Sequence, residues 1–325
     1  MSNWVWLSRV MLFGLAGTAA FAGILFSIFG FSSPRKSVAD VRSDRLQAAA
    51  VTPEEMQVLQ LSAPQPPATL PQLAPSLKSG GKAPAPLLKS GGRTKVQPRP
   101  FNLQQSLKNY SPLFAAPTSI GMVAIGAAEG NYRLITKDGT LYVQQNPSYF
   151  GHTDPGNLSW GERVTNYGPC SDQGRSGGNL ALAEQLCLER ARYALPVQLV
   201  DLNAAGIDPN QDLEAVLNVA DLYNQAKPIH SRYFPQALAI ARKGGLVGIE
   251  AIAWARTASF YLNANNQMDI ERGANQATGL LGICIREGRP ITEWQCVYDD
   301  QMRRVKAITN ALEKYRVFMQ RGRKQ

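Results

Sequence analysis

The chain has 325 residues, of which 44% are hydrophobic and 18% charged, and this composition excludes a wholly disordered protein. Its formal net charge is +10, but residues 101–302 carry 15 basic and 19 acidic side chains, so the excess positive charge lies in the flanks. A nucleic-acid-binding core with its own basic face is therefore not expected. Two histidines in the whole chain argue against a histidine-rich metal centre, and we expect neither a metal nor a cofactor.

The N-terminus predicts a membrane anchor. Residues 10–31 form an uncharged apolar run which, at 1.5 Å per residue, is about 33 Å long and could cross a bilayer. Trp4 and Trp6 precede the run, as suits a membrane interface. An A-x-A pattern at residues 20–22 leaves a cleavable signal peptide open. Because that pattern lies inside the run, we favour an uncleaved transmembrane anchor over residues 1–32.

Residues 33–100 predict a disordered, basic, Pro-rich linker. This stretch holds 11 of the 21 prolines, ten basic side chains against four acidic ones, and no aromatic residue. Such a composition cannot build a core, although one short helix is expected at residues 53–61. Its positive charge would suit anionic headgroups or an acidic wall polymer, and simple solubility is the alternative. We expect residues 101–325 to form the globular domain.

The four cysteines bear on the cellular compartment. All lie in the expected globular domain, where they permit three pairings of Cys170, Cys187, Cys284 and Cys296. Disulfides would imply an oxidising compartment such as the periplasm, whereas four reduced buried thiols would suit the cytoplasm. The basic side chains at residues 35–45 favour a cytoplasmic position for the part of the chain after the span. We favour a single-pass inner-membrane protein with its globular domain in the periplasm.

The globular domain is expected to be α+β and mainly α. Apolar side chains recur at helical spacing in six segments. These are residues 117–129, 178–193, 211–226, 233–243, 247–262 and 298–321. Residues 132–143 instead predict two short strands around a Lys137-Asp138-Gly139 turn, and residues 146–157 predict an ordered loop.

Glu129 is the strongest candidate for chemistry. It closes the first of these helices, and Gly130 would let the chain turn sharply into the hairpin. The partial negative charge of a helix C-terminus and apolar neighbours such as Met122 both favour a protonated carboxyl. A general acid must carry such a proton, and glycoside cleavage needs a general acid beside the scissile oxygen. A polar helix end without catalytic function is the alternative.

This order of elements resembles the lysozyme-like superfamily, and phage-type lysozymes give the closest local match. In that pattern a Glu-Gly is followed nine residues later by an Asp and then by Gly-His-Thr. Here Glu129-Gly130 is followed by Asp138 and by Gly151-His152-Thr153. The resemblance covers residues 122–157 and implies a lysozyme-like fold with Glu129 as general acid and Asp138 as second carboxylate. Additional residues before Gly151 and Gln144 in place of a Thr depart from the pattern.

Other residues could complete the site. Asp154 is a rival second carboxylate, although Asp138 and Asp154 both also stand in sequences typical of turns. Arg256 is expected to bind substrate or to pair with a buried carboxylate, either Glu129 or Asp154. The remaining expected substrate-binding residues are Tyr149, Phe150, His152 and Asn157. Core packing is the alternative for the two aromatic residues, and a loop contact is the alternative for the histidine.

The sequence favours a peptidoglycan glycosidase, either a muramidase or a lytic transglycosylase, tethered to the membrane. The chain also resembles a set of cyanobacterial membrane-anchored proteins, through Ala-Glu-Gly (128–130), residues 151–157 and residues 254–260. The expected partners are peptidoglycan, the inner membrane through residues 10–31, and proteins of an envelope complex. A non-catalytic module that binds peptidoglycan or a protein partner is the main alternative. A scaffold whose basic tails contact membrane or nucleic acid is the third.

Overall fold

The computed structural model describes residues 58–60 and 100–322. This part of the chain is mainly helical, with small antiparallel β-elements, as the α+β expectation required. The helices are α1 (Leu103–Tyr110), α2 (Ile120–Glu129), α3 (Pro155–Leu158), α4 (Leu180–Ala204), α5 (Leu213–Gln225), α6 (Pro228–Lys243), α7 (Gly248–Ala258), α8 (Thr278–Arg286) and α9 (Glu293–Gly322). The strands are β1 (Val58–Gln60), β2 (Tyr132–Lys137), β3 (Thr140–Gln145), β4 (His152–Thr153), β5 (Thr165–Asn166), β6 (Tyr261–Leu262) and β7 (Ala274–Asn275).

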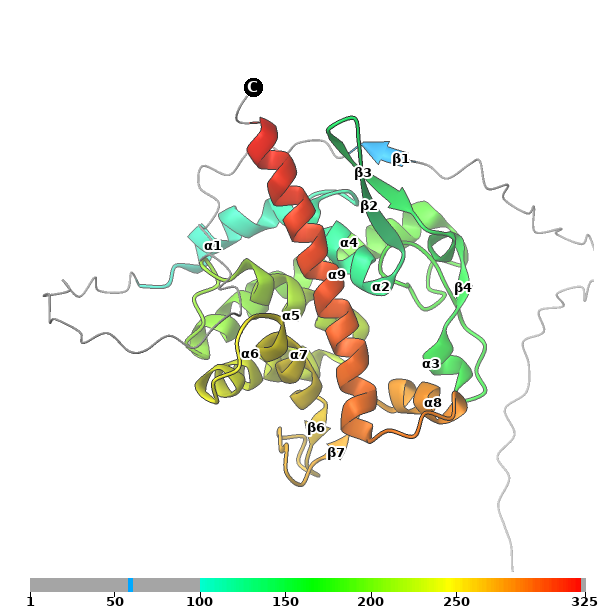
Figure 1. Cartoon of the computed structure of the whole chain (residues 1–325), viewed down its shortest axis with the longest axis vertical. Helices are drawn as coiled ribbons and strands as arrows, with labels where there is room; N and C mark the ends of the chain where they lie inside the picture. Colours follow the sequence, from blue (N-terminus) through cyan, green and yellow to red (C-terminus); the bar gives the residue numbers. More distant parts are fainter. Residues whose placement is uncertain (1–57, 61–99, 323–325) are drawn as a thin grey trace, which may run out of the picture. The chain divides into compact units, whose positions relative to one another are not determined.

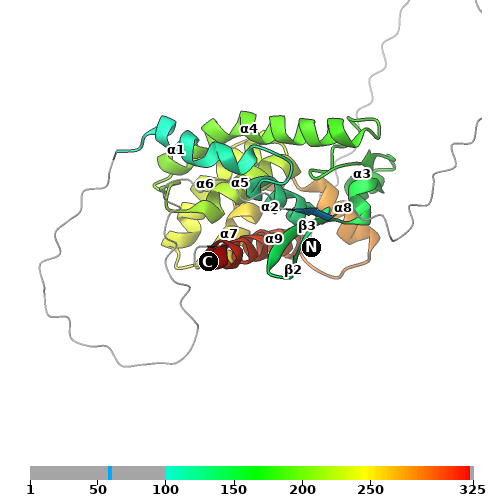
Figure 2. The ribbon, with the colours of Figure 1, turned by 90° about the horizontal axis from the view of Figure 1, so that it is seen from above.

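Helix α2 lies at the centre of the domain. All but two of its residues are buried, as expected for a helix that is apolar on every side. It contacts α5 and α9, and Figure 2 shows α4 and α9 on opposite sides of the domain with α2 and α5 between them. Glycine allows a close approach on one face, because a Cβ at Gly126 would lie 2.4 Å from the ring of Tyr132 on β2.

Gly130 ends α2 and fixes where Glu129 stands. Its φ of 82° is left-handed, and its N–H donates to the carbonyls of Gly126 and Ala127, as in a common helix C-cap. The chain then turns directly into β2. Glu129 is therefore the last residue of a buried helix whose direction is fixed by its packing.

Strands β2 and β3 form the predicted hairpin. Tyr132 pairs with Gln145 at one end and Lys137 with Thr140 at the other. Asp138 and Gly139 make the turn with φ of 51° and 75°. A type I′ turn needs positive φ at both of its central residues. Strand β1 pairs with the other edge of β3, so residues 58–60 form a strand where the sequence predicted part of a helix.

All six segments predicted to be helical contain a helix, but several of the predicted helix ends were wrong. Helix α4 continues to Ala204, well beyond the predicted end at 193, with Pro196 inside it. Helix α6 begins five residues before its predicted start, with Pro228 in its first turn. Pro is favourable there because a first-turn N–H has no partner within the helix. Helices α1, α3 and α8 were not predicted.

Two disulfides join elements of the domain, as expected. Cys170 bonds Cys187 on α4, and Cys284 on α8 bonds Cys296 on α9. Their Cα atoms are 5.6 and 6.3 Å apart, within the usual range for a disulfide. In Figure 1, α3 and α8 lie beside each other near the N-terminal end of α9.

The predicted membrane anchor, residues 1–32, lies outside the described residues, as does the predicted linker apart from residues 58–60 and Pro100. Within residues 58–60 and 100–322, none of the helices combines the length and apolar character needed to cross a bilayer.

Candidate functional site

A cleft of about 900 Å³ runs between the helical core and the segment that carries α3 and α8. One wall comes from α4 and from the junction of α5 with α6. The lining also includes α3, residues 276–283 and three residues of α9, namely Asp300, Arg303 and Arg304. The carboxyl-bearing Glu129 lines the cleft at the end of α2. The volume of the cleft lies within the range of small-molecule sites in proteins.

Three hydrogen bonds hold the Glu129 carboxylate. Nη1 and Nη2 of Arg304 donate to its two oxygens at 3.0 and 3.1 Å, which is a bidentate ion pair. The Nδ2 of Asn224, on α5, donates to Oε1 at 2.9 Å. The side chain is 10% exposed, so it reaches the cleft but is mostly covered. Three N–H donors thus surround the Glu129 carboxylate, whereas the sequence suggested apolar surroundings.

The ion pair belongs to a buried charge network across four helices. Asp221 on α5, fully buried, accepts from Arg256 at 2.6 Å and from Arg304 at 3.2 Å. Arg256, on α7, is also fully buried, and it donates to Gln301 at 2.6 Å. The network therefore links Glu129 of α2 to α5, α7 and α9 by direct contacts.

Charge balance keeps the network stable. Burial lowers the pKa of Arg256, and the carboxylate of Asp221 opposes that shift. Burial also tends to lower the pKa of Arg304, but the neighbouring carboxylates of Glu129, Asp221 and Asp300 outweigh this effect of burial. They raise the pKa of the Arg304 guanidinium well above its usual value. Both guanidinium groups therefore remain charged and paired.

A second arginine, Arg303, contacts the C-terminal end of α2. Arg303 donates from Nη1 to the carbonyl of Ala128 at 2.9 Å and from Nη2 to Asp300 at 2.7 Å. Burial tends to raise the pKa of Asp300, but Arg304 and Arg303 outweigh it and lower that pKa. A guanidinium at a helix C-terminus also opposes the partial negative charge of the helix dipole.

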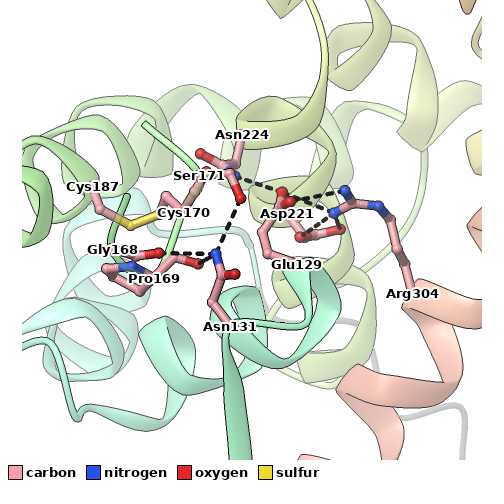
Figure 3. The surroundings of a disulfide bond; sticks show 10 residues. All are labelled: Glu129, Asn131, Gly168, Pro169, Cys170, Ser171, Cys187, Asp221, Asn224 and Arg304. Carbon is pink, nitrogen blue, oxygen red and sulfur yellow. Dashed lines mark hydrogen bonds and ion pairs between the residues drawn. A yellow bond between two sulfur atoms is a disulfide. The ribbon is translucent and has the colours of Figure 1, made fainter. Parts of the chain in front are cut away.

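One disulfide lies next to Glu129 (Figure 3). The Nδ2 of Asn224 that donates to Glu129 also contacts the carbonyl oxygen of Cys170 at 3.0 Å. Cys170 is bonded to Cys187 of α4. On the other side of the same loop, Nδ2 of Asn131 contacts the carbonyl oxygen of Gly168 at 2.9 Å. The loop is thus held to the end of α2 from both sides.

Asp154 also lines the cleft, where it caps α3. Its Oδ1 accepts from the backbone N–H of Asn157 at 2.7 Å, and its Oδ2 accepts from Nδ2 of Asn166 at 2.8 Å. These contacts match the turn-forming alternative for Asp154 and also fix its carboxylate in the cleft wall. Asn157 lines the cleft as well.

Both histidines line the cleft. His152 places Nδ1 at 2.8 Å from the carbonyl of Ser148, and His230 places Nδ1 at 2.9 Å from the carbonyl of Ser259. Burial lowers the pKa of His230, with Lys227 adding to the shift and the Ser259 carbonyl opposing it. His230 is therefore a neutral group at neutral pH, and sequence reasoning did not single it out for the site.

Four expected site residues lie away from the cleft lining. Asp138 is exposed at the hairpin turn, so the structure does not bring it to Glu129. Tyr149 is buried, stacks on Tyr132 and donates its hydroxyl to Glu184. Phe150 packs edge-on against Tyr149, as the core alternative required. Arg256 pairs with Asp221 rather than with Glu129 or Asp154, and its burial keeps it from direct contact with a ligand.

The cleft also contains residues that sequence reasoning missed. Trp160 is 55% exposed and lines the cleft just after α3. Its position just after the predicted loop at residues 146–157 was the available signal, because an indole ring can stack on a ligand. Arg304 gave no local signal, since it lies 175 residues from Glu129 in sequence. The described residues contain no group of three or more His, Cys, Asp or Glu arranged to hold a metal ion.

Comparison of the chain with protein-family models, with curated proteins and with solved structures gave no match.

Proposed function

We propose that this protein is a peptidoglycan glycosidase in which Glu129 protonates the glycosidic oxygen. The observation that carries the proposal is the position of Glu129 at the end of a buried helix, on the wall of a cleft of about 900 Å³. Its resemblance to the lysozyme-like superfamily rests on the same helix end and on the hairpin that comes after it. Exposed Trp160 in that cleft supplies a face on which a sugar ring can stack.

The proposed reaction requires Glu129 to change its partner. Its two oxygens accept hydrogen bonds from Arg304 and Asn224, so both are occupied by protein donors. Bound substrate must therefore replace at least one of these contacts while Glu129 carries a proton. Transfer of that proton to the glycosidic oxygen would allow the bond to the sugar C1 to break.

Asp154 is the second carboxylate of this proposal. Of the two carboxylates expected to serve this role, it is the one that lines the cleft with Glu129. Two N–H donors hold it in place, so its charge is fixed beside the sugar and can stabilise positive charge in the transition state. A lytic transglycosylase would need Glu129 alone, because the sugar's own hydroxyl then attacks C1.

The first prediction concerns Glu129→Gln. The full-length chain should release sugar products from peptidoglycan, and Glu129→Gln should reduce the release by at least about a hundredfold, because general acid catalysis typically contributes that much. Products would be identified by mass, with anhydro ends indicating a transglycosylase and reducing ends a hydrolase. Glu162→Gln is the matched control, because Glu162 is exposed and lies outside the cleft lining.

Circular dichroism would establish that each variant is folded. Equal release from the wild type and from Glu129→Gln would contradict the assigned role of Glu129. No release from a folded wild type would contradict the enzymatic function itself.

The bidentate contact with Arg304 favours a second candidate function, a non-catalytic module that binds peptidoglycan or an envelope protein. In that case Glu129 would serve as one member of a structural charge network, and the cleft would bind without cleaving. Binding of peptidoglycan by a folded wild type that releases no product would support this second function.

We also propose that the domain works in the periplasm, anchored by residues 10–31. Two disulfides support this location, because disulfides persist mainly in oxidising compartments. Protease treatment of intact spheroplasts would test it: digestion of the domain would support the location, and protection until lysis would contradict it.

A further inference from the structure

Two arginines on the cleft wall lack a carboxylate partner among the described residues. Arg175 and Arg190 both line the cleft. Arg190 donates to the carbonyl of Tyr223 at 2.8 Å, and its guanidinium lies 4.8 Å from the centre of the Tyr223 ring. Its Nε is buried and, in this part of the chain, has no hydrogen-bond partner. The guanidinium of Arg175 contacts the side-chain oxygen of Gln173 at 2.9 Å.

These two arginines differ from the other two arginines at the cleft. Arg303 and Arg304 are matched by Glu129, Asp221 and Asp300. At Arg190, by contrast, burial lowers the pKa and the nearby positive charge of Arg175 lowers it further. Two like charges on the cleft wall, neither with an ion-pair partner among residues 58–60 and 100–322, form a place where an anion would be stabilised.

Arg190 lies on the side of the cleft where Glu129 is held. Tyr223, whose carbonyl accepts from Arg190, immediately precedes Asn224, which donates to Glu129. Arg190 also lies about one turn of α4 after Cys187, on the same face of the helix. A ligand group bound by Arg190 would therefore belong to a substrate that also reaches Glu129.

We propose that Arg175 and Arg190 bind a carboxylate carried by the glycan strand and so determine substrate specificity. The inference rests on the proposed function of the cleft. Guanidinium groups suit this role because their N–H groups match the geometry of a carboxylate. Two sources have this chemistry in peptidoglycan: the stem peptide, and the lactyl group that remains when the stem is removed. Chitin oligosaccharides carry neither and are uncharged.

The test measures binding of three glycans of matched length by the full-length chain. These are peptide-bearing strands, amidase-treated strands that keep the lactyl carboxylate, and chitin oligosaccharides. The wild type should bind at least one of the two anionic glycans about tenfold more tightly than chitin, as expected for hydrogen bonds to a charged group. Arg175→Gln combined with Arg190→Gln should remove that preference and leave chitin binding unchanged.

Arg232→Gln combined with Arg242→Gln is the matched control, because both arginines lie outside the cleft lining and the net charge changes equally. Tight binding of peptide-bearing strands alone identifies the carboxylates of the stem, and tight binding of amidase-treated strands alone identifies the lactyl carboxylate. Tight binding of both shows that the site accepts either carboxylate. Equal binding of all three glycans by the wild type would overturn this inference alone. Retention of the preference by the double variant would also overturn it. Failure to bind any of the three would overturn the proposed function together with the inference.

Discussion

At the scale of residues, the charge network shows what a sequence can and cannot predict. The position of Glu129 was predictable, because Gly130 marks the end of an apolar helix and a left-handed cap requires glycine or a residue like it. The pairing of Glu129 with Arg304 was not predictable from the sequence, since this contact depends on how α9 packs on α2. Arg256 was expected to meet a carboxylate, but the structure supplies Asp221, which carried no motif.

The second prediction concerns the burial of this network. Arg256→Gln should lower the free energy of unfolding by about 3–5 kcal/mol, because it removes one of the two cations paired with the fully buried carboxylate of Asp221. Urea unfolding monitored by circular dichroism would measure it. Arg232→Gln breaks an ion pair in which the Arg232 side chain is 58% exposed, and it should change stability by at most about 1 kcal/mol. Similar losses from the two variants would contradict a structural role for the buried pair.

At the scale of elements, the sequence predicted where helices and strands form better than it predicted the residues at which they begin and end. Periodic apolar residues predicted the buried helices, and Asp138-Gly139 predicted the hairpin turn. The predicted end of α4 at residue 193 was wrong: the helix continues through Pro196 to Ala204, because the packing of a 25-residue helix overrides one missing N–H. Helix α3 has four residues and no buried side chain, so it offered no apolar period to detect.

The third prediction concerns the contact between α2 and β2. A Cβ at Gly126 would lie 2.4 Å from the Tyr132 ring, so Gly126→Ala must displace the hairpin or the helix. We expect a loss of about 1–3 kcal/mol in the free energy of unfolding, as for other overpacked cores, together with weaker glycan cleavage. Gly244→Ala is the control: φ is −75° there and the nearest heavy atom would be 3.4 Å from the new Cβ. Equal stability of the two variants in thermal unfolding would contradict the close approach.

At the scale of the whole domain, two cross-links hold different parts of the cleft. Cys170–Cys187 fixes the loop whose carbonyl oxygen contacts Asn224, whereas Cys284–Cys296 joins α8 to α9. The cysteines could be counted from the sequence, but their pairing depended on which helices lie side by side. The described domain is thus a helical core onto which the cleft walls are fastened.

The fourth prediction separates these two cross-links. Replacing Cys170 and Cys187 by Ser should cost about 3 kcal/mol of stability, because the bond closes a loop with a sequence separation of 17 residues. Replacing Cys284 and Cys296, with a separation of 12, should cost a similar amount. At a temperature where both variants are folded, the first should lose more of the proposed glycan cleavage, because it alone frees the loop beside Glu129. A larger loss of activity in the variant without Cys284 and Cys296 would contradict the role of the Cys170–Cys187 bond in holding this loop.

Strand β1 sets how far the domain could stand from a membrane. Residues 58–60 pair with β3, so the chain already meets the domain at β1. For a chain anchored by the predicted span at residues 10–31, only residues 32–57 would separate bilayer and domain. Fully extended, such a segment measures at most about 90 Å. A glycan strand farther away would lie beyond the cleft, so the pairing of three residues would confine the proposed activity to the wall layer nearest the membrane.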